Sequence, residues 1–289
     1  MKALMRLAYM GWWFVRARFM GRRRPLQSVV FVTSGCDATC RHCTLCTRQE
    51  KCFKPFDAIA ADLDYCYAQG ARLLDIEGVY LTEWHDGSHT AADIFLLARE
   101  KGFYSVSTMV KAHDYGAWQQ MNADADVVWV SVRGIDDCRC LEAMAGASLY
   151  MVVDADNSGE IAPVMEFVRE HEGIRQIAFN MHTPFAGTEE KALSESQRSE
   201  VIQSLIDYKR RGYRIMNSVA GLKNMLTLRF KRRCWICNFI YCDGRRSPQC
   251  IDDMGSGMCE KCGFSMAGEM SAVFAMKPDT ILAGLGIRL

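Results

Sequence analysis

Hydrophobic and polar positions alternate in two regular ways along most of this chain. Short runs rich in β-branched and aromatic residues predict strands, and longer runs with apolar residues at helical spacing predict helices. The predicted strands span residues 28–35, 72–81, 104–110, 127–134, 149–155 and 175–183. The helices predicted to follow them span residues 56–71, 90–102, 115–124, 138–147, 161–173 and 194–212.

A strand is thus followed by a helix six times in succession. Glycines mark several helix ends, as at Gly70 and Gly212, and Ser194 can cap the start of the last helix. Strands that alternate with helices form a parallel sheet. Six such units fit an α/β fold that is either an open barrel or a doubly wound sheet. In both folds, ligands bind at the carboxyl ends of the strands.

Composition indicates a globular protein whose charge is unevenly spread. The 289 residues are 49% hydrophobic and 24% charged, with a formal net charge of +1. Residues 1–26 contain seven bases and no acid, which leaves a net charge of −6 on the rest. A basic arm therefore precedes a mildly acidic body. No RNA-binding extension is visible, so no nucleic-acid partner is expected.

The arm mixes arginines with aromatic residues and predicts a basic amphipathic helix. Its longest uncharged run, Leu7 to Val15, is far shorter than the roughly 20 residues of a membrane span. One interpretation is an interfacial helix, with Trp12 and Trp13 at headgroup depth and arginines on anionic lipid. The other is a helix that caps its own domain or a partner subunit. We expect a cytoplasmic protein, peripheral at the inner face of the membrane under the first interpretation.

Fourteen cysteines are concentrated near the two ends of the chain. A disulfide scaffold fits poorly, because the chain is large enough for a sizeable core and shows no cleavable signal peptide. Gaps of two and three residues are typical of metal ligands in a reducing compartment. The first group is Cys36, Cys40, Cys43, Cys46 and Cys52, and the second is Cys234, Cys237, Cys242, Cys250, Cys259 and Cys262.

The first group follows the first predicted strand directly. Cys36, Cys40 and Cys43 can hold three irons of a 4Fe–4S cluster and leave the fourth iron open to a ligand, whereas four thiolates would close it. Zinc is the alternative metal, and it would require Cys46 or His42 as a fourth ligand.

A strand, then C-x3-C-x2-C, then a helix resembles the radical S-adenosylmethionine superfamily. The stretch "GCDATCRHC" fits its signature, with His42 where an aromatic residue is usual. The resemblance implies a partial (β/α)6 TIM-type barrel and a 4Fe–4S cluster whose open iron binds S-adenosyl-L-methionine (SAM). It also implies a one-electron reductant such as flavodoxin or ferredoxin. One electron would cleave SAM to a 5′-deoxyadenosyl radical, which abstracts hydrogen from a substrate.

The resemblance also suggests where SAM binds. The family's second strand usually ends in Gly-Gly-Glu-Pro, and here the matching stretch is "DIEGVYLTEWHDG", with Gly78 in place of one glycine. Either Glu77 or Glu83 could contact the SAM ammonium, or backbone carbonyls could suffice. Ser107 ends the third strand and Ser131 the fourth. Arg133 either pairs the SAM carboxylate or forms an ordinary salt bridge at the rim.

The fifth and sixth strands face the substrate in this architecture. Asn180, His182 and Thr183 follow one another at the end of the sixth strand, where alternate side chains point into one space. We assign Asn180 and His182 to the substrate site. The alternative for His182 is a buried or capping histidine.

The carboxyl-terminal cysteines resemble the SPASM and Twitch extensions of the same superfamily, which hold auxiliary 4Fe–4S clusters. Asp243-Gly244 predicts a hairpin, and we expect it and the C-x2-C knuckle of Cys259 and Cys262 to lie near the fifth and sixth strands. The expected cluster ligands are Cys234, Cys250, Cys259 and Cys262, although Cys237 or Cys242 could replace one of them. Zinc is again the alternative. An unused thiol, assigned to Cys242, would donate a hydrogen atom to a substrate radical or simply be buried, and Cys52 is expected to be a spare thiol.

These predictions divide the chain into an amino-terminal helix (1–26), a radical SAM barrel (27–220) and a small cysteine-rich extension (221–289). A peptide substrate is favoured by the extension, a sugar by the compact chain and a lipid by the arm. Two other functions stay open, an iron–sulfur electron carrier and a zinc-stabilised binding module.

Overall fold

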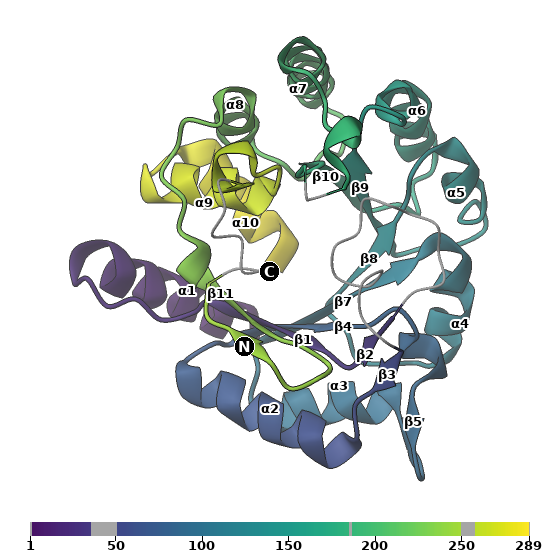
Figure 1. Cartoon of the computed structure of the whole chain (residues 1–289), viewed down its shortest axis with the longest axis vertical. Coiled ribbons are helices and arrows are strands. Elements are labelled where there is room, and N and C mark those ends of the chain that lie inside the picture. Colours follow the sequence, from purple (N-terminus) through teal and green to yellow (C-terminus); the bar gives the residue numbers. More distant parts are fainter. Residues whose placement is uncertain (1, 36–50, 185–186, 250–257, 289) are drawn as a thin grey trace.

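The computed structural model describes residues 2–35, 51–184, 187–249 and 258–288, and Figure 1 shows its architecture. One sheet dominates, with strand order β10-β9-β8-β7-β4-β1-β11-β12. Neighbouring strands are parallel except for β12, which is antiparallel to β11. The strands are β1 (Gln27–Phe31), β4 (Leu73–Glu77), β7 (Ser105–Lys111), β8 (Val127–Ser131), β9 (Ser148–Val153), β10 (Gln176–Met181), β11 (Cys237–Ile240) and β12 (Arg246–Ser247).

All six predicted strands are present, as β1, β4, β7, β8, β9 and β10, and each is followed by a helix. These helices are α2 (Phe56–Gln69), α3 (Ala91–Glu100), α4 (Tyr115–Gln120), α5 (Ile135–Arg139), α6 (Ile161–Glu170) and α7 (Glu195–Arg210). They cover the outside of a sheet that curves into a partial barrel (Figure 1), so this prediction is confirmed. Ser194 caps α7 as expected, because its hydroxyl accepts from the Gln197 N–H.

Helix α5 begins before the predicted span 138–147. Two acidic side chains fix its start: Glu160 accepts from the Ile135 N–H at 2.9 Å, and Asp137 accepts from the Arg133 N–H at 2.6 Å. Carboxylates stabilise the exposed N–H groups of a helix start. The signal for this helix thus lay in acidic residues rather than in the apolar residues that follow.

The carboxyl-terminal hairpin extends the barrel sheet. Strand β11 lies parallel to β1, with Val30 opposite Ile240, and β12 returns beside β11. We expected this hairpin beside the fifth and sixth strands, and that prediction was wrong. The Cys259–Cys262 stretch does reach the sixth strand, because the Met181 N–H of β10 donates to the Gly263 carbonyl at 3.0 Å. Beside the gap between β10 and β11 lie α8 (Val219–Thr227), α9 (Ser265–Phe274) and α10 (Pro278–Arg288) (Figure 1).

Helix α1 (Lys2–Phe19) packs across the amino-terminal ends of the barrel strands. Trp13 is buried in a cluster with Leu26 and Leu73, which lie at the starts of β1 and β4. Arg6 is buried and pairs with Asp126, the residue before β8. The interpretation that this helix caps its own domain is therefore correct for its inner face. Among the described helices, none is long and apolar enough to cross a bilayer.

Candidate active site

The structure places the residues on both sides of residues 36–50, which we call the first cysteine stretch. Cys36, Cys40 and Cys43 lie in residues 36–50, outside the described residues. Strand β2 (Thr33–Ser34) continues from β1 and pairs with β3 (Cys52–Phe53), so that Ser34 lies opposite Cys52. The stretch therefore leaves and rejoins the fold at the carboxyl end of β1, where a parallel α/β sheet binds its ligands.

Two acids from β4 face the inside of the barrel beside that point. Leu74 and Ile76 are fully buried in the core between sheet and helices, so Asp75 and Glu77 point inward. Burial raises the pKa of the Glu77 carboxyl well above its ordinary value, the charge of Asp75 adds to this, and a backbone hydrogen bond at Met109 opposes it. The raised pKa favours the protonated form of Glu77, and a cation beside it would favour the carboxylate.

Gly78 is required where β4 passes β2. A Cβ atom at Gly78 would overlap the Thr33 hydroxyl, which accepts the Tyr80 N–H at 3.1 Å. Glu83 lies farther on, in a short 3-10 helix (Leu81–Glu83), and is exposed. Of the two candidates that the sequence left open, only Glu77 lies on a barrel strand.

Other predicted SAM-binding residues line the same interior or its rim. Ser107 is buried and its hydroxyl donates to Asp75. Ser131 ends β8 opposite Lys111. Arg133 pairs with the buried carboxylate of Asp154 at 3.3 Å, which is the rim salt bridge that the sequence offered as an alternative.

Asn180 and His182, which were assigned to the substrate site, form hydrogen bonds to other parts of the protein. The Asn180 side-chain oxygen accepts from the Ser265 N–H at 2.8 Å and from its hydroxyl at 2.5 Å, and its amide group donates to the Tyr150 hydroxyl. His182 is buried, and its Nε2 lies 3.1 Å from both the carbonyl and the hydroxyl of Thr188. Burial lowers the pKa of His182. These contacts favour positioning roles for both residues.

Sequence reasoning missed three side chains of the interior. Tyr150 on β9 meets Trp129 on β8 edge to face, with ring centroids 6.4 Å apart, and Met109 lies opposite Trp129 on β7. Strand alternation alone could have found them, because each lies one residue from a buried core position.

The structure brings two parts of the second cysteine group near each other. Cys234 begins a 3-10 helix (Cys234–Ile236) that leads into Cys237 at the start of β11. Cys259 lies in another (Met258–Lys261), and Cys262 follows it and is buried. The Arg232 guanidinium donates to the Glu260 carbonyl at 3.2 Å, which joins the two segments.

The prediction for Cys52 needs correction, and the predictions of metal ligands stay open. Cys52 is not a spare thiol, because it is bonded to Cys242. In this bonded state Cys242 has no S–H hydrogen to donate. Cys250 lies outside the described residues, and within the described ranges no group of three or more His, Cys, Asp or Glu side chains is arranged to hold a metal. The metal-ligand predictions therefore stay predictions.

Solved structures share this fold. Streptococcus suis SuiB bound to S-adenosylmethionine is similar over 81% of this chain and 62% of its own, with a TM-score of 0.60 and 14% identity. The enzyme anSMEcpe with bound AdoMet is similar over 84% of this chain and 82% of its own, with a TM-score of 0.55 and 12% identity.

The chain shares the fold of these two proteins solved with S-adenosylmethionine bound, as its resemblance to the radical SAM superfamily implies. The predicted partial barrel is confirmed, and the chain spans less than two thirds of the SAM-bound SuiB chain. No protein-family model matches the sequence, and no curated protein matches it.

Proposed function

We propose that this protein is a radical SAM enzyme, which cleaves S-adenosyl-L-methionine reductively to a 5′-deoxyadenosyl radical that abstracts hydrogen from a substrate. One observation carries the proposal: a C-x3-C-x2-C stretch leaves and rejoins the carboxyl end of β1, inside the radical SAM fold. Cys36, Cys40 and Cys43 would hold the 4Fe–4S cluster, which supplies the electron and the open iron when bound. A flavodoxin or ferredoxin would reduce it.

The residues inside the barrel would orient SAM. Glu77 offers a carboxyl group whose pKa is raised by burial, and the SAM ammonium beside it would favour its charged form. Gly78 allows β4 to pass close to β2. Ser107 and Ser131 would contribute hydroxyls from the neighbouring strands, and Arg133 a guanidinium at the rim.

The carboxyl-terminal cysteines would hold an auxiliary 4Fe–4S cluster. Cys234, Cys250, Cys259 and Cys262 are the proposed ligands. The hydrogen bond between Arg232 and Glu260 supports the proximity of the segments that carry Cys234 and Cys259. Cys237 is the alternative ligand. With Cys242 bonded to Cys52, a hydrogen-donor role for Cys242 requires that the bond first be reduced.

A peptide is the substrate class that we propose. SuiB has been solved bound to the precursor peptide SuiA, and anSMEcpe with a Kp18Cys peptide. The shared fold extends over 92% of this chain in the SuiA complex. Asn180 and His182 would then shape the peptide site by holding its walls.

Peripheral contact with an anionic membrane is part of the proposal. The outer face of α1 exposes Leu4, Trp12 and Phe19, at 72%, 56% and 63% of their surface, while Arg6 is buried on the inner face. A helix that exposes its apolar residues and buries a base is suited to a second apolar surface. The other six bases of residues 1–26 favour anionic headgroups, and they would repel an identical helix of a second copy.

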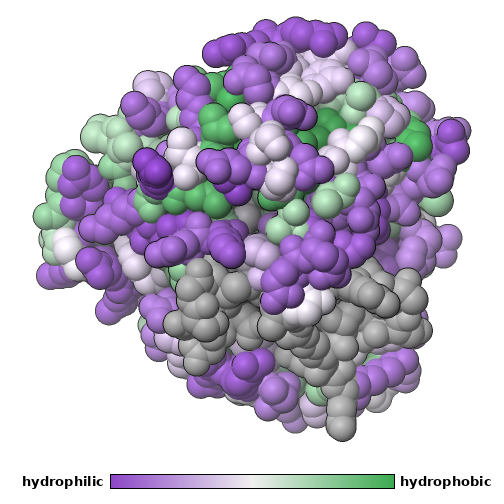
Figure 2. All heavy atoms as spheres, turned by 45° about the horizontal axis from the view of Figure 1, so that its top comes forward, coloured by the Kyte–Doolittle hydropathy of each residue, from purple (hydrophilic) through white to green (hydrophobic). Residues whose placement is uncertain are grey.

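The position of α1 also orients the molecule. Its end lies at the left margin of Figure 1, and hydrophobic residues are among those visible at that margin in Figure 2. Because α1 covers the amino-terminal ends of the strands, a membrane beneath it would lie opposite the cysteine end of the barrel. The arm therefore gives no support to a lipid substrate.

Anaerobic SAM cleavage tests the proposal. The reconstituted protein, reduced with dithionite, should release 5′-deoxyadenosine, and Cys36→Ala, Cys40→Ala and Cys43→Ala should each abolish release. Cys140→Ser is the matched control, because Cys140 is an exposed cysteine outside both groups. Normal release by the three variants would refute the proposal. A brown protein without cleavage would indicate an electron carrier, and a colourless zinc protein would indicate a binding module.

A further inference from the structure

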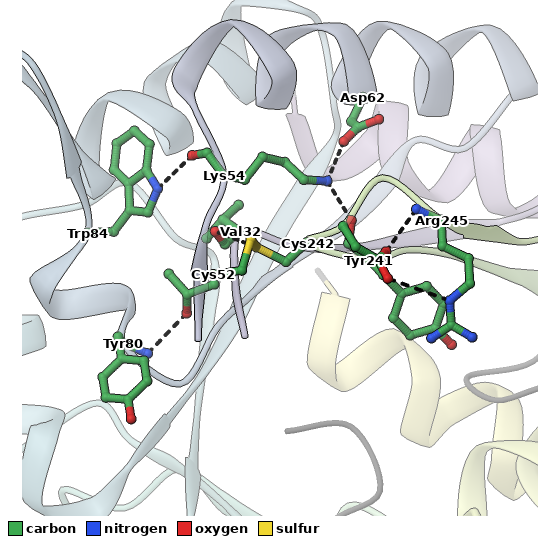
Figure 3. The surroundings of a disulfide bond; sticks show 11 residues. Val32, Cys52, Lys54, Asp62, Tyr80, Trp84, Tyr241, Cys242 and Arg245 are labelled. Carbon is green, nitrogen blue, oxygen red and sulfur yellow. Dashed lines mark hydrogen bonds and ion pairs between the residues drawn. A yellow bond between two sulfur atoms is a disulfide. The ribbon is translucent and has the colours of Figure 1, made fainter. Parts of the chain in front are cut away.

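Cys52 and Cys242 are bonded to each other although they are 190 residues apart in the chain. Their Cα atoms are 6.4 Å apart, within the range that a disulfide bridges. Figure 3 shows that the bond joins two different segments. Cys52 begins β3, directly after residues 36–50, and Cys242 lies between β11 and Cys250. The bond therefore links the bases of the two cysteine-rich stretches.

Other contacts keep these segments together independently of the sulfur atoms. The buried ammonium of Lys54 donates to the Tyr241 carbonyl at 2.7 Å and to the Asp62 carboxylate at 2.6 Å. The Lys54 N–H donates to the Val32 carbonyl at 2.9 Å, and its own carbonyl accepts the Trp84 indole N–H at 3.0 Å (Figure 3). Reduction of the bond would therefore leave the two thiols as neighbours that can bond again.

We infer that Cys52 and Cys242 form a reversible thiol–disulfide site, which fastens the base of the first cysteine stretch to the carboxyl-terminal hairpin under oxidising conditions. The Cys52 thiolate, the less buried of the two, attacks a low-molecular-weight disulfide such as oxidised glutathione. This forms a mixed disulfide and releases one thiol. Cys242 then attacks the Cys52 sulfur, which forms the protein disulfide and releases the second thiol. A dithiol reverses both steps.

The bond would change how often residues 52–54 separate from the carboxyl-terminal hairpin. It would not change where they lie when the two are in contact. A crosslink restricts the open states of the chain, and here it joins residues that are distant in sequence. The bond would hold residues 52–54 against the hairpin, and reduction would leave the contacts of Lys54 to do so alone.

Thiol alkylation and hydrogen exchange test this inference on the full-length protein, without any need for SAM cleavage. After equilibration with oxidised glutathione, peptide mapping should find Cys52 linked to Cys242, and a dithiol should convert both to alkylated thiols. The amides of residues 33–34 and 52–54 should exchange several-fold faster after reduction. Cys140→Ser should keep both responses, because Cys140 lies on another part of the barrel.

The variants Cys52→Ser and Cys242→Ser should exchange like the reduced wild-type protein under both conditions. The reduced wild type is the reference, so a folding defect in either variant does not decide the test. Alkylation of both cysteines in the oxidised wild type would overturn the inference. Loss of iron in either variant would also overturn it, because the pair would then be metal ligands. Equal exchange in both redox states would exclude the fastening role.

Discussion

Gly263 lies directly against Met181, so that a side chain at Gly263 would overlap the Met181 carbonyl oxygen. The Gly263 carbonyl accepts the Met181 N–H, and the Gly263 N–H donates to the Thr183 hydroxyl at 2.8 Å. The carboxyl-terminal region thus docks on the end of β10 by backbone contact immediately after Cys262. These contacts therefore join the end of β10 to the segment that carries Cys259 and Cys262.

Replacement of this glycine should loosen the extension. We expect Gly263→Ala to lower the free energy of unfolding by about 1–3 kcal/mol, the usual effect of an overpacked methyl group. Gly159→Ala is the matched control, because nothing lies within 4 Å of a Cβ atom there. Urea unfolding of both variants measures the difference. Equal stability would show that the contact between Gly263 and Met181 does not hold the extension.

The barrel was predictable because its signals are local. Strand periodicity occurs within each unit, and glycines mark several of the helix ends, so all six strands were found. Strand β11 has only four residues, Cys237–Ile240, and nothing in them indicates β1 as the partner. The bond between Cys52 and Cys242 likewise depends on contact between distant segments.

Side-chain direction was the other limit of the sequence. Helix α1 is apolar on both faces, so its pattern does not say whether Trp12 or Trp13 is buried. In "DIEG", the sequence does not say whether the Glu77 side chain points into the barrel or toward the helices. Ile76 is fully buried beneath the helices, so its neighbour Glu77 points into the barrel. Polar residues near the end of a strand, such as Asn180, look like ligand residues in sequence even where they hold the extension.

The buried carboxyl of Glu269 should make stability depend on pH. It accepts the N–H and hydroxyl of Ser218, and Lys209 and Asp279 are the charged groups that act on it. Burial raises its pKa to about 7, from a usual value of 4.5. The folded protein therefore binds a proton that the unfolded chain has released, and this stabilisation, present below pH 4.5, is lost as the pH rises through about 7.

The variant Glu269→Gln should remove that dependence. Between pH 4.5 and 7.5, the wild type should lose about 3 kcal/mol more unfolding free energy than the variant. Urea unfolding at several pH values measures both curves. Parallel curves would show that Glu269 is ionised in the folded protein. Glu83→Gln, at an exposed acid, should follow the wild type.

Binding of SAM should depend on the protonation of Glu77. Its pKa is raised in the empty barrel, and a cation favours its ionised form, so affinity for SAM should increase as the pH rises. Glu77→Gln should weaken binding roughly tenfold or more and flatten the pH dependence, because a charged hydrogen bond is lost. Equilibrium binding to the anaerobic, cluster-loaded protein measures this. A pH dependence that persists in the variant would assign it to another group.

The two adjacent tryptophans of α1 should have separate effects. Trp12 is exposed, whereas Trp13 is buried and its indole donates to the Arg24 carbonyl at 2.9 Å. Trp13→Ala should therefore lower the free energy of unfolding by about 3–5 kcal/mol, as for other buried aromatic residues. Trp12→Ala with Phe19→Ala should leave stability nearly unchanged and weaken binding to anionic liposomes, because both side chains lie on the outer face of the helix.

The arginines that follow α1 should also contribute to binding of anionic liposomes. Replacement of Arg22, Arg23 and Arg24 by glutamine should weaken it by about 3 kcal/mol, at roughly 1 kcal/mol for each base near an anionic surface. Cosedimentation with liposomes of increasing anionic content measures this, and added salt should reduce the difference by screening. Neutral liposomes are the control. If the wild type ignores anionic liposomes at low salt, the outer face of α1 binds a protein instead, and Trp12→Ala should then disrupt that complex.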